Sequence, residues 1–308
     1  MLDKVVVFFI LITALAGSVF LWFVYFKNYR FATILFDFLP FYPIFVLSGF
    51  VTSSYGLIYL FGNNILLPLI LGLFLLYFGV QFTIYWRWYA SYRLKYYLEF
   101  LRRLKNNPKF RIIGINEWLD RPQKDPDHVL VLIRHDVDIS LIRAKRMLEE
   151  EEKLEIPSCY YLRNSAERYS FDEAKEFIYY LHSSSLFSVG FHYESITKAK
   201  GDLTKATKLF LEEVEEFRSI YPIRMIAAHG DKYRNRRLVS ERLVDLKSLE
   251  LKSSYQLPYD QYLSEAGGFH HFESKNNKKE TFMEKLKVVD KITTGSLVQI
   301  LIHPDWWF

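Results

Sequence analysis

The stretch VLVLIRHDVD, at Val129–Asp138, decides the fold. Its first five residues are apolar, as in a strand buried on both faces of a parallel sheet, and charged residues follow at once. Further strands of this kind are predicted, with helical patterns between them, at 158–162, 186–191, 223–228, 251–255 and 296–302. This alternation predicts an α/β domain at residues 126–308, built on a parallel sheet that is either open and doubly wound or closed as a barrel.

Side chains suited to metal chemistry follow four of these strands: Asp136 and Asp138, His192, His229 and His303. The carboxyl ends of parallel strands meet at one side of a sheet, so we expect these side chains to lie close together. Histidine nitrogens and carboxylate oxygens are common zinc ligands, and a second carboxylate can take a proton from water. The pattern therefore predicts a metal centre, whereas any one of these residues alone also fits packing or helix capping.

The order and spacing of three segments resemble the polysaccharide deacetylase family, also called the NodB-homology family. These segments are Arg134–Asp138, Gly190–Glu194, and Leu301–Pro304 with Trp307. The resemblance covers about residues 128–307. It implies a distorted (β/α) barrel of NodB type. It also implies a metal-dependent hydrolase that removes the acetyl group from an N-acetylated sugar.

The resemblance further implies roles for individual residues. Asp136 corresponds to the catalytic base and His303 to the general acid, while Asp138 and His192 correspond to metal ligands. The family usually has a second metal-binding histidine four residues after the first, and this chain has Ile196 there, which cannot bind a metal. A third ligand must therefore come from elsewhere in the chain.

We expect His229 to be this third ligand, with Glu194 as the alternative. If neither residue binds a metal, the domain is a degenerate relative that binds glycans without catalysis. Zn²⁺ is the ion expected from such ligands, and the implied chemistry is metal-assisted amide hydrolysis.

Substrate contacts are expected from three aromatic residues. A backbone N–H near Tyr161 is expected to help stabilise the oxyanion, and Tyr193 and Trp307 are candidates for contact with a sugar ring, or for packing alone. A metallophosphoesterase is the alternative enzyme, because His-Asp and Asp-x-Asp pairs also occur in sites that cleave phosphate esters. A single aspartate pair with separate histidines suits one metal ion better than two.

The first ninety residues have the composition of a membrane region. Apolar runs at 5–26, 41–61 and 65–86 have the length of roughly 20 residues that crosses the hydrocarbon layer, so residues 1–90 are expected to form about three transmembrane helices. Lysine and arginine residues follow the first and third runs, which places the catalytic domain on the cytoplasmic face. The single cysteine, Cys159, excludes an intramolecular disulfide and agrees with this location.

Residues 91–125 are predicted to form a basic, aromatic juxtamembrane linker, and the segment 87–111 fits binding to anionic lipid headgroups. The bases of this segment account for much of the net charge of +5, so the charge does not favour a nucleic-acid partner. The expectation is a multi-pass membrane protein that acts on a membrane-associated glycan or a lipid-linked sugar. The sequence predicts no oligomeric state.

Overall fold

The computed structural model describes residues 93–164, 166, 168–230, 237, 239–264 and 289–307. The chain divides into two units, 1–90 and 91–308, and the helices and strands described lie in the second. The predicted spans at 5–26, 41–61 and 65–86 lie outside the described residues. Among the helices that are described, none combines the length and the apolar character needed to cross a membrane.

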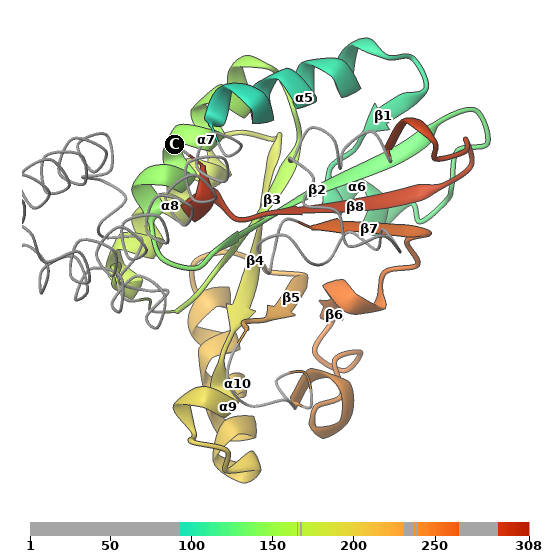
Figure 1. The fold of residues 1–308 in the computed structure, drawn as a ribbon. Helices are drawn as coiled ribbons and strands as arrows, with labels where there is room; N and C mark the ends of the chain where they lie inside the picture. The colour runs from blue at the N-terminus through green and yellow to red at the C-terminus, as the bar shows by residue number, and fades with distance from the viewer. Residues whose placement is uncertain are drawn as a thin grey trace, which may run out of the picture. The chain divides into compact units, whose positions relative to one another are not determined.

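A parallel sheet organises the domain (Figure 1). Its strands follow the order β6-β5-β4-β3-β2-β8-β7, and β1 pairs with the first part of β2. Every ladder between described strands is parallel, so the predicted α/β architecture is confirmed, and the curled sheet with its helices matches a distorted (β/α) barrel. The strands are β1 (Phe110–Ile112), β2 (Val129–Val137), β3 (Ser158–Leu162), β4 (Phe187–Tyr193), β5 (Met225–Ala228), β6 (Lys252–Ser253), β7 (Gln261–Ser264) and β8 (Leu297–Ile302).

Helices connect most of these strands, and side-chain caps fix where several of them begin. Ser140 caps α7, Asp202 caps α10, and Ser170 forms a capping box with Glu173 at the start of α8. The α-helices are α5 (Leu94–Asn106), α6 (Ile115–Asp120), α7 (Leu141–Lys153), α8 (Phe171–His182), α9 (Ser195–Lys198) and α10 (Leu203–Arg218), and the shorter turns are η2 (Val239–Leu243), η3 (Ser254–Gln256) and η4 (Pro304–Trp306).

Two predicted boundaries differ from the structure. Strand β2 continues to Val137, so Asp136 lies inside the strand and only Asp138 lies beyond its end. Residues 94–120 form α5, β1 and α6 and pack on the sheet, where the sequence predicted a linker. In α5, Tyr97 is fully buried, so its ring cannot lie among lipid headgroups; the apolar side of this helix faces the domain.

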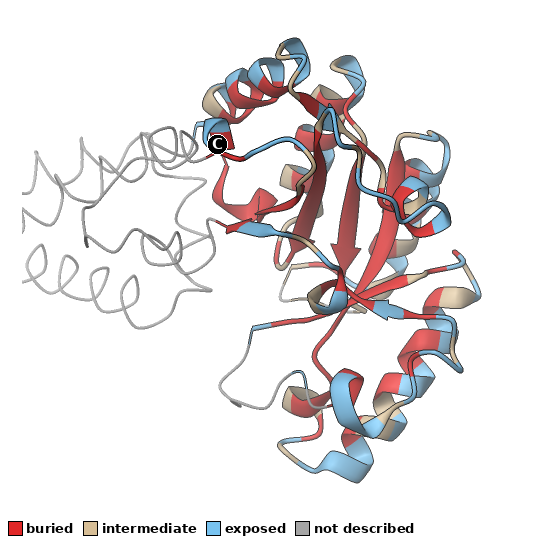
Figure 2. Cartoon of the chain, turned by 90° about the vertical axis from the view of Figure 1, so that its right-hand side faces the viewer, coloured by how far each residue is buried: buried red, intermediate tan, exposed pale blue. Residues whose placement is uncertain are grey.

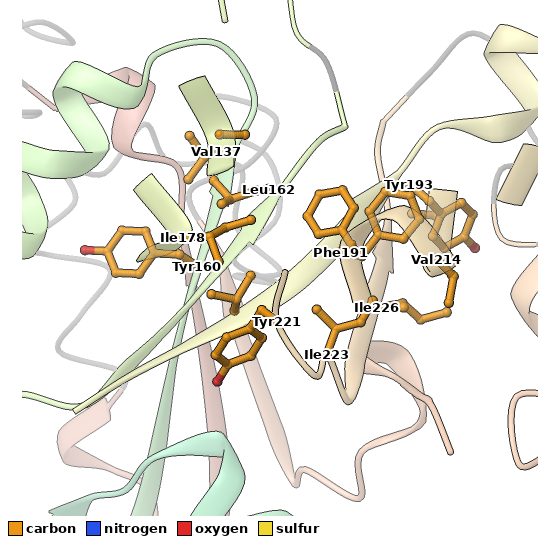
Figure 3. Packing of buried hydrophobic residues seen from close by; sticks show 14 of the residues in the cluster. Val137, Tyr160, Leu162, Ile178, Phe191, Tyr193, Val214, Tyr221, Ile223 and Ile226 are labelled. Atoms are coloured by element: carbon orange, nitrogen blue, oxygen red, sulfur yellow. The ribbon is translucent and has the colours of Figure 1, made fainter. Parts of the chain in front are cut away.

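The sheet separates two sets of buried side chains, because successive residues of a strand point to opposite faces. We call the first set the helix-side core; it contains Val137, Tyr160, Phe191 and Ile226, which pack together with residues of α7, α8 and α10 (Figure 3). Five strands, β2, β3, β4, β5 and β8, are buried along their length, and β1, β6 and β7 also carry exposed residues. The helices bury one side and expose the other (Figure 2).

The opposite side of the sheet is the inner face. It carries Leu130, Leu132, Cys159, Tyr161 and Ala227, which cluster with residues of α6. Counting in steps of two along β2, the same face receives Arg134, Asp136 and Asp138 as well. The fold thus collects Arg134, Asp136 and Asp138 on the inner face, whereas His135 points to the helix side, where its Nε2 lies 2.7 Å from Oε1 of Glu151.

Candidate metal centre

Asp138, His192 and His229 meet at the carboxyl ends of β2, β4 and β5. Each residue offers one ligand atom, and these atoms lie within 4.8 Å of one another. Nε2 of His192 is 3.2 Å from Oδ1 of Asp138, and Nε2 of His229 is 3.6 Å from the same oxygen. The structure therefore brings together the three residues that the sequence analysis selected as ligands.

The outer nitrogens of the two histidines have their own neighbours. Nδ1 of His192 lies 3.1 Å from the carbonyl oxygen of Ala227, and Nδ1 of His229 lies 3.4 Å from Oε2 of Glu194. The first contact is a hydrogen bond, whereas the second is an ion-pair distance, since Nδ1 of His229 has no hydrogen-bond partner among the described residues. In both rings an acceptor beside Nδ1 leaves Nε2 available to a metal. The buried Oδ1 of Asp138 has no hydrogen-bond partner within the described part of the chain. Two nitrogens and one carboxylate oxygen in this arrangement fit a zinc ion with an open coordination position.

Electrostatics keep Asp138 ionised, as a metal ligand must be. Burial alone raises the pKa of its carboxyl group, but His229, His192 and His303 lower it by more, and the pKa lies far below its ordinary value.

Asp136 lies beside this cluster, with Oδ2 3.5 Å from Nε2 of His192. Arg134 donates two hydrogen bonds to its carboxylate, and Nη1 of the same guanidinium donates to Oγ of Ser254 over 2.6 Å. Burial raises the pKa of Asp136, while Arg134 and then His192 lower it, and the net pKa is below the ordinary value. Asp136 is therefore an ionised carboxylate that can accept a proton.

His303 follows β8, and its Nε2 is 4.0 Å from Oδ2 of Asp138. Asp305, two residues later, ties this end of β8 to the segment after β2: its carboxylate accepts from the backbone N–H groups of Asp138, Ile139 and Ser140 at 3.0, 3.0 and 2.7 Å. The sequence analysis did not select Asp305. The only sequence signal for it is an acidic residue directly after Pro304, in the first turn of η4.

The three residues predicted to contact substrate are mainly packing residues. Tyr193 is 1% exposed in the helix-side core, and its hydroxyl lies 2.6 Å from Oγ of Ser240 (Figure 3). Trp307 is 3% exposed, and its ring centroid is 5.4 Å from that of Tyr97. The interpretation of these two rings as a sugar platform is therefore corrected, because neither offers a face to solvent.

Tyr161 is also buried, and its ring lies under the guanidinium of Arg134, whose Cζ is 4.8 Å from the ring centroid. Its backbone pairs with Asp136 on one side and Gly190 on the other. Ile196 is buried in the helix-side core, which agrees with its exclusion as a ligand.

Some solved structures resemble part of this chain weakly. No model of a known family and no curated protein matches the chain. The peptidoglycan deacetylase PdaC from Bacillus subtilis, in a mutant form, matches with a TM-score of 0.38 and 13% identity over 58% of this chain and 77% of that chain. A CE4 family pseudoenzyme from Bacillus anthracis matches with a TM-score of 0.35 and 14% identity over 64% of this chain and 59% of that chain. A mutant of that protein with restored enzymatic activity matches equally well, over 61% of its length.

Proposed function

We propose that the chain is a metal-dependent deacetylase that hydrolyses the N-acetyl group of an acetylated sugar. The observation that carries the proposal is the convergence of Asp138, His192 and His229, with the ionised carboxylate of Asp136 next to them. A ligand trio of this kind beside a separate proton acceptor is what hydrolysis of an unactivated amide requires. Zn²⁺ is the ion that the two histidines and the aspartate suit best.

A divalent ion at this site would polarise the acetyl carbonyl and acidify water. Asp136 would accept the proton of the attacking water, because its carboxylate stays ionised against Arg134. His303, beside Asp138, would donate a proton to the sugar nitrogen as the C–N bond breaks. The backbone at Tyr161, which was expected to help stabilise the oxyanion, is paired with β2 and β4, so that stabilisation is left to the ion. The products are acetate and a free amine.

The membrane setting is also part of the proposal. The apolar runs in residues 1–90 support an integral membrane protein, and the bases after them support a catalytic domain on the cytoplasmic face. On α5, the side turned away from the domain exposes Lys95 and Arg102, with Glu99 between them, and exposed bases of this kind suit anionic lipid. The substrate proposed from this setting is a membrane-associated glycan or a lipid-linked sugar.

The first test is acetate release by the purified full chain in detergent, with added Zn²⁺ or with a chelator. Tetra-N-acetylchitotetraose and a membrane glycolipid extract are the substrates. Asp136→Asn keeps the shape of the side chain but cannot accept the proton, and Asp120→Asn, in an exposed ion pair with Arg224, is the matched control. We expect zinc-dependent release by the wild type and the control only.

Other outcomes of this test would point to the alternatives. Phosphate release from sugar phosphates without acetate release would favour a metallophosphoesterase. Glycan binding that is insensitive to the chelator and to Asp136→Asn, with no product, would favour a degenerate binding protein. Arg134 donates a hydrogen bond to each carboxylate oxygen of Asp136, and this feature suits the degenerate binding protein.

A further inference from the structure

We infer that Arg163 and Glu194 act as a positioning pair that orients the third metal ligand, His229, and fixes its distance from Asp138. The inference rests on the proposed function, and it assigns a positioning role at the metal centre to two further residues. Neither residue is a catalytic group, since each acts through a ligand.

Glu194 contacts His229 on the side away from the other ligands. Its Oε2 is 3.4 Å from Nδ1 of His229, an ion-pair distance, and this Nδ1 has no hydrogen-bond partner among the described residues. The Nε2 of that ring is the atom near Asp138. A carboxylate next to Nδ1 favours the tautomer with the proton on Nδ1, which leaves the lone pair of Nε2 for a metal. Glu194 is therefore placed as the neighbour of a ligand, and the alternative that it is itself the third ligand is not favoured.

Arg163 holds Glu194 in this place. Its Nη2 donates to Oε1 of Glu194 over 2.7 Å, and its Nη1 donates to the carbonyl oxygen of Asp138 over 2.8 Å. Both side chains of the pair are buried, at 4% and 8% exposure. One planar guanidinium thus connects the backbone of Asp138 with the side chain of Glu194, which orients His229. A lysine has no two donors in this fixed planar arrangement and cannot make both contacts.

The position of the pair explains how the chain supports a ligand set without a histidine at position 196. Ile196 turns into the helix-side core, and Glu194, at the N-terminal end of α9, turns toward the ligands. The third nitrogen comes instead from His229 at the end of β5, a separate strand, so its orientation depends on a contact that bridges β3, β4 and β5. Arg163 and Glu194 provide that bridge.

The test measures affinity for Zn²⁺ and the visible spectrum of the Co²⁺-substituted full chain, neither of which needs turnover. Glu194→Gln keeps the size of the side chain and removes its charge, and Arg163→Lys keeps a charge and removes the fork. We expect each variant to bind one metal ion about 10- to 100-fold more weakly, with Co²⁺ bands at unchanged wavelengths. The double variant should be little weaker than either single variant, because the two residues act as one unit.

Glu213→Gln is the matched control. Glu213 is also a buried glutamate in an ion pair, with Lys198 at 2.6 Å, but it lies on α10 and outside the ligand set, so its variant should bind Zn²⁺ as the wild type does. Unchanged affinity in both Glu194→Gln and Arg163→Lys would overturn the inference and leave the metal centre intact. Shifted Co²⁺ bands in Glu194→Gln would also overturn it, since they would make Glu194 a ligand. A wild type that binds no metal would instead contradict the proposed function.

Discussion

Arg134 holds Asp136 by both carboxylate oxygens: Nε donates to Oδ1 over 2.7 Å and Nη2 donates to Oδ2 over 2.6 Å. The two residues are next-but-one neighbours on β2, so their side chains share the inner face. Both are buried, and the ring of Tyr161 lies against the guanidinium. Arg134 therefore controls the basicity of the residue that we propose as the proton acceptor.

Arg134→Gln is expected to move the acid limb of the pH profile of kcat/KM to higher pH. Asp136 must be ionised to accept a proton, so activity falls as the pH drops through its pKa. The guanidinium holds this pKa below the ordinary value, and its removal lets burial raise the pKa. Acetate release measured across pH tests this, with Arg224→Gln, in an exposed ion pair, as the control. If the acid limb stayed at the wild-type pH, Arg134 would not control the pKa of the proposed base, Asp136.

Gly190→Ala is expected to destabilise the domain by about 1–3 kcal/mol, the usual cost of overpacking a filled core. A Cβ at residue 190 would lie 2.6 Å from Cδ1 and Cε1 of the Tyr161 ring, which Arg134 covers. Gly114→Ala is the control, because the nearest atom to its added Cβ is 3.8 Å away. Urea unfolding of both variants tests this prediction. Equal free energies of unfolding for Gly190→Ala and Gly114→Ala would mean that the Tyr161 ring moves aside without cost.

The sequence was sufficient to predict the parallel sheet and the convergence of the three proposed ligands. Apolar runs define the buried strands, and the geometry of a parallel sheet brings their carboxyl ends together, so Asp138, His192 and His229 meet although they are far apart in the chain. The same reasoning placed Asp136 next to them. These predictions depend on strand position alone, which a sequence pattern reveals.

The packing of neighbouring side chains was harder to predict, for two reasons. Side chains of a strand alternate between its two faces, and Tyr193 follows His192 in β4. Applied to this pair, the alternation would have placed Tyr193 in the helix-side core. Asp305 and Glu194 lie in turns, where no periodicity fixes the direction of a side chain. Their contacts with the segment after β2 and with His229 depend on the folded geometry of those turns.

Glu151→Gln is expected to reduce stability at neutral pH and to weaken the loss of stability in acid. Glu151 is fully buried and accepts hydrogen bonds from His135, Ser158 and Tyr160 at 2.7, 2.7 and 2.8 Å, and from Tyr97 of α5. Burial raises its pKa, but His135 and the hydrogen bonds lower it below the ordinary value of 4.5.

The sign of the pH effect follows from this lowered pKa. The stabilising contribution of Glu151 is complete above pH 4.5, the ordinary pKa, and is lost as the pH falls through the lower pKa of the folded state. Urea unfolding of the full chain in a pH series should show a flatter acid dependence for Glu151→Gln than for the wild type. Glu152→Gln, on the exposed side of α7, should keep the wild-type slope. Equal slopes for all three proteins would show that Glu151 has the same pKa folded and unfolded.

Asp305→Ala is expected to lower the free energy of unfolding by roughly 1–3 kcal/mol, since three backbone N–H groups lose their acceptor in a buried place. These N–H groups belong to Asp138, Ile139 and Ser140, so the change also loosens the segment that carries a proposed ligand. Zinc affinity should therefore fall together with stability, although Asp305 is not itself proposed to bind metal.

Asp305→Asn separates these two effects. The amide keeps one acceptor oxygen in place of two, so stability and zinc affinity should lie between those of the wild type and Asp305→Ala. Asp290→Ala is the control, because Asp290 pairs with Arg103 on the surface, where an ion pair contributes little to stability. Stability and zinc affinity are measured on the same preparations by urea unfolding and by competition with a chromophoric chelator. Wild-type zinc affinity in a destabilised Asp305→Ala would mean that Asp138 keeps its position without the three hydrogen bonds, and that Asp305 serves the fold alone.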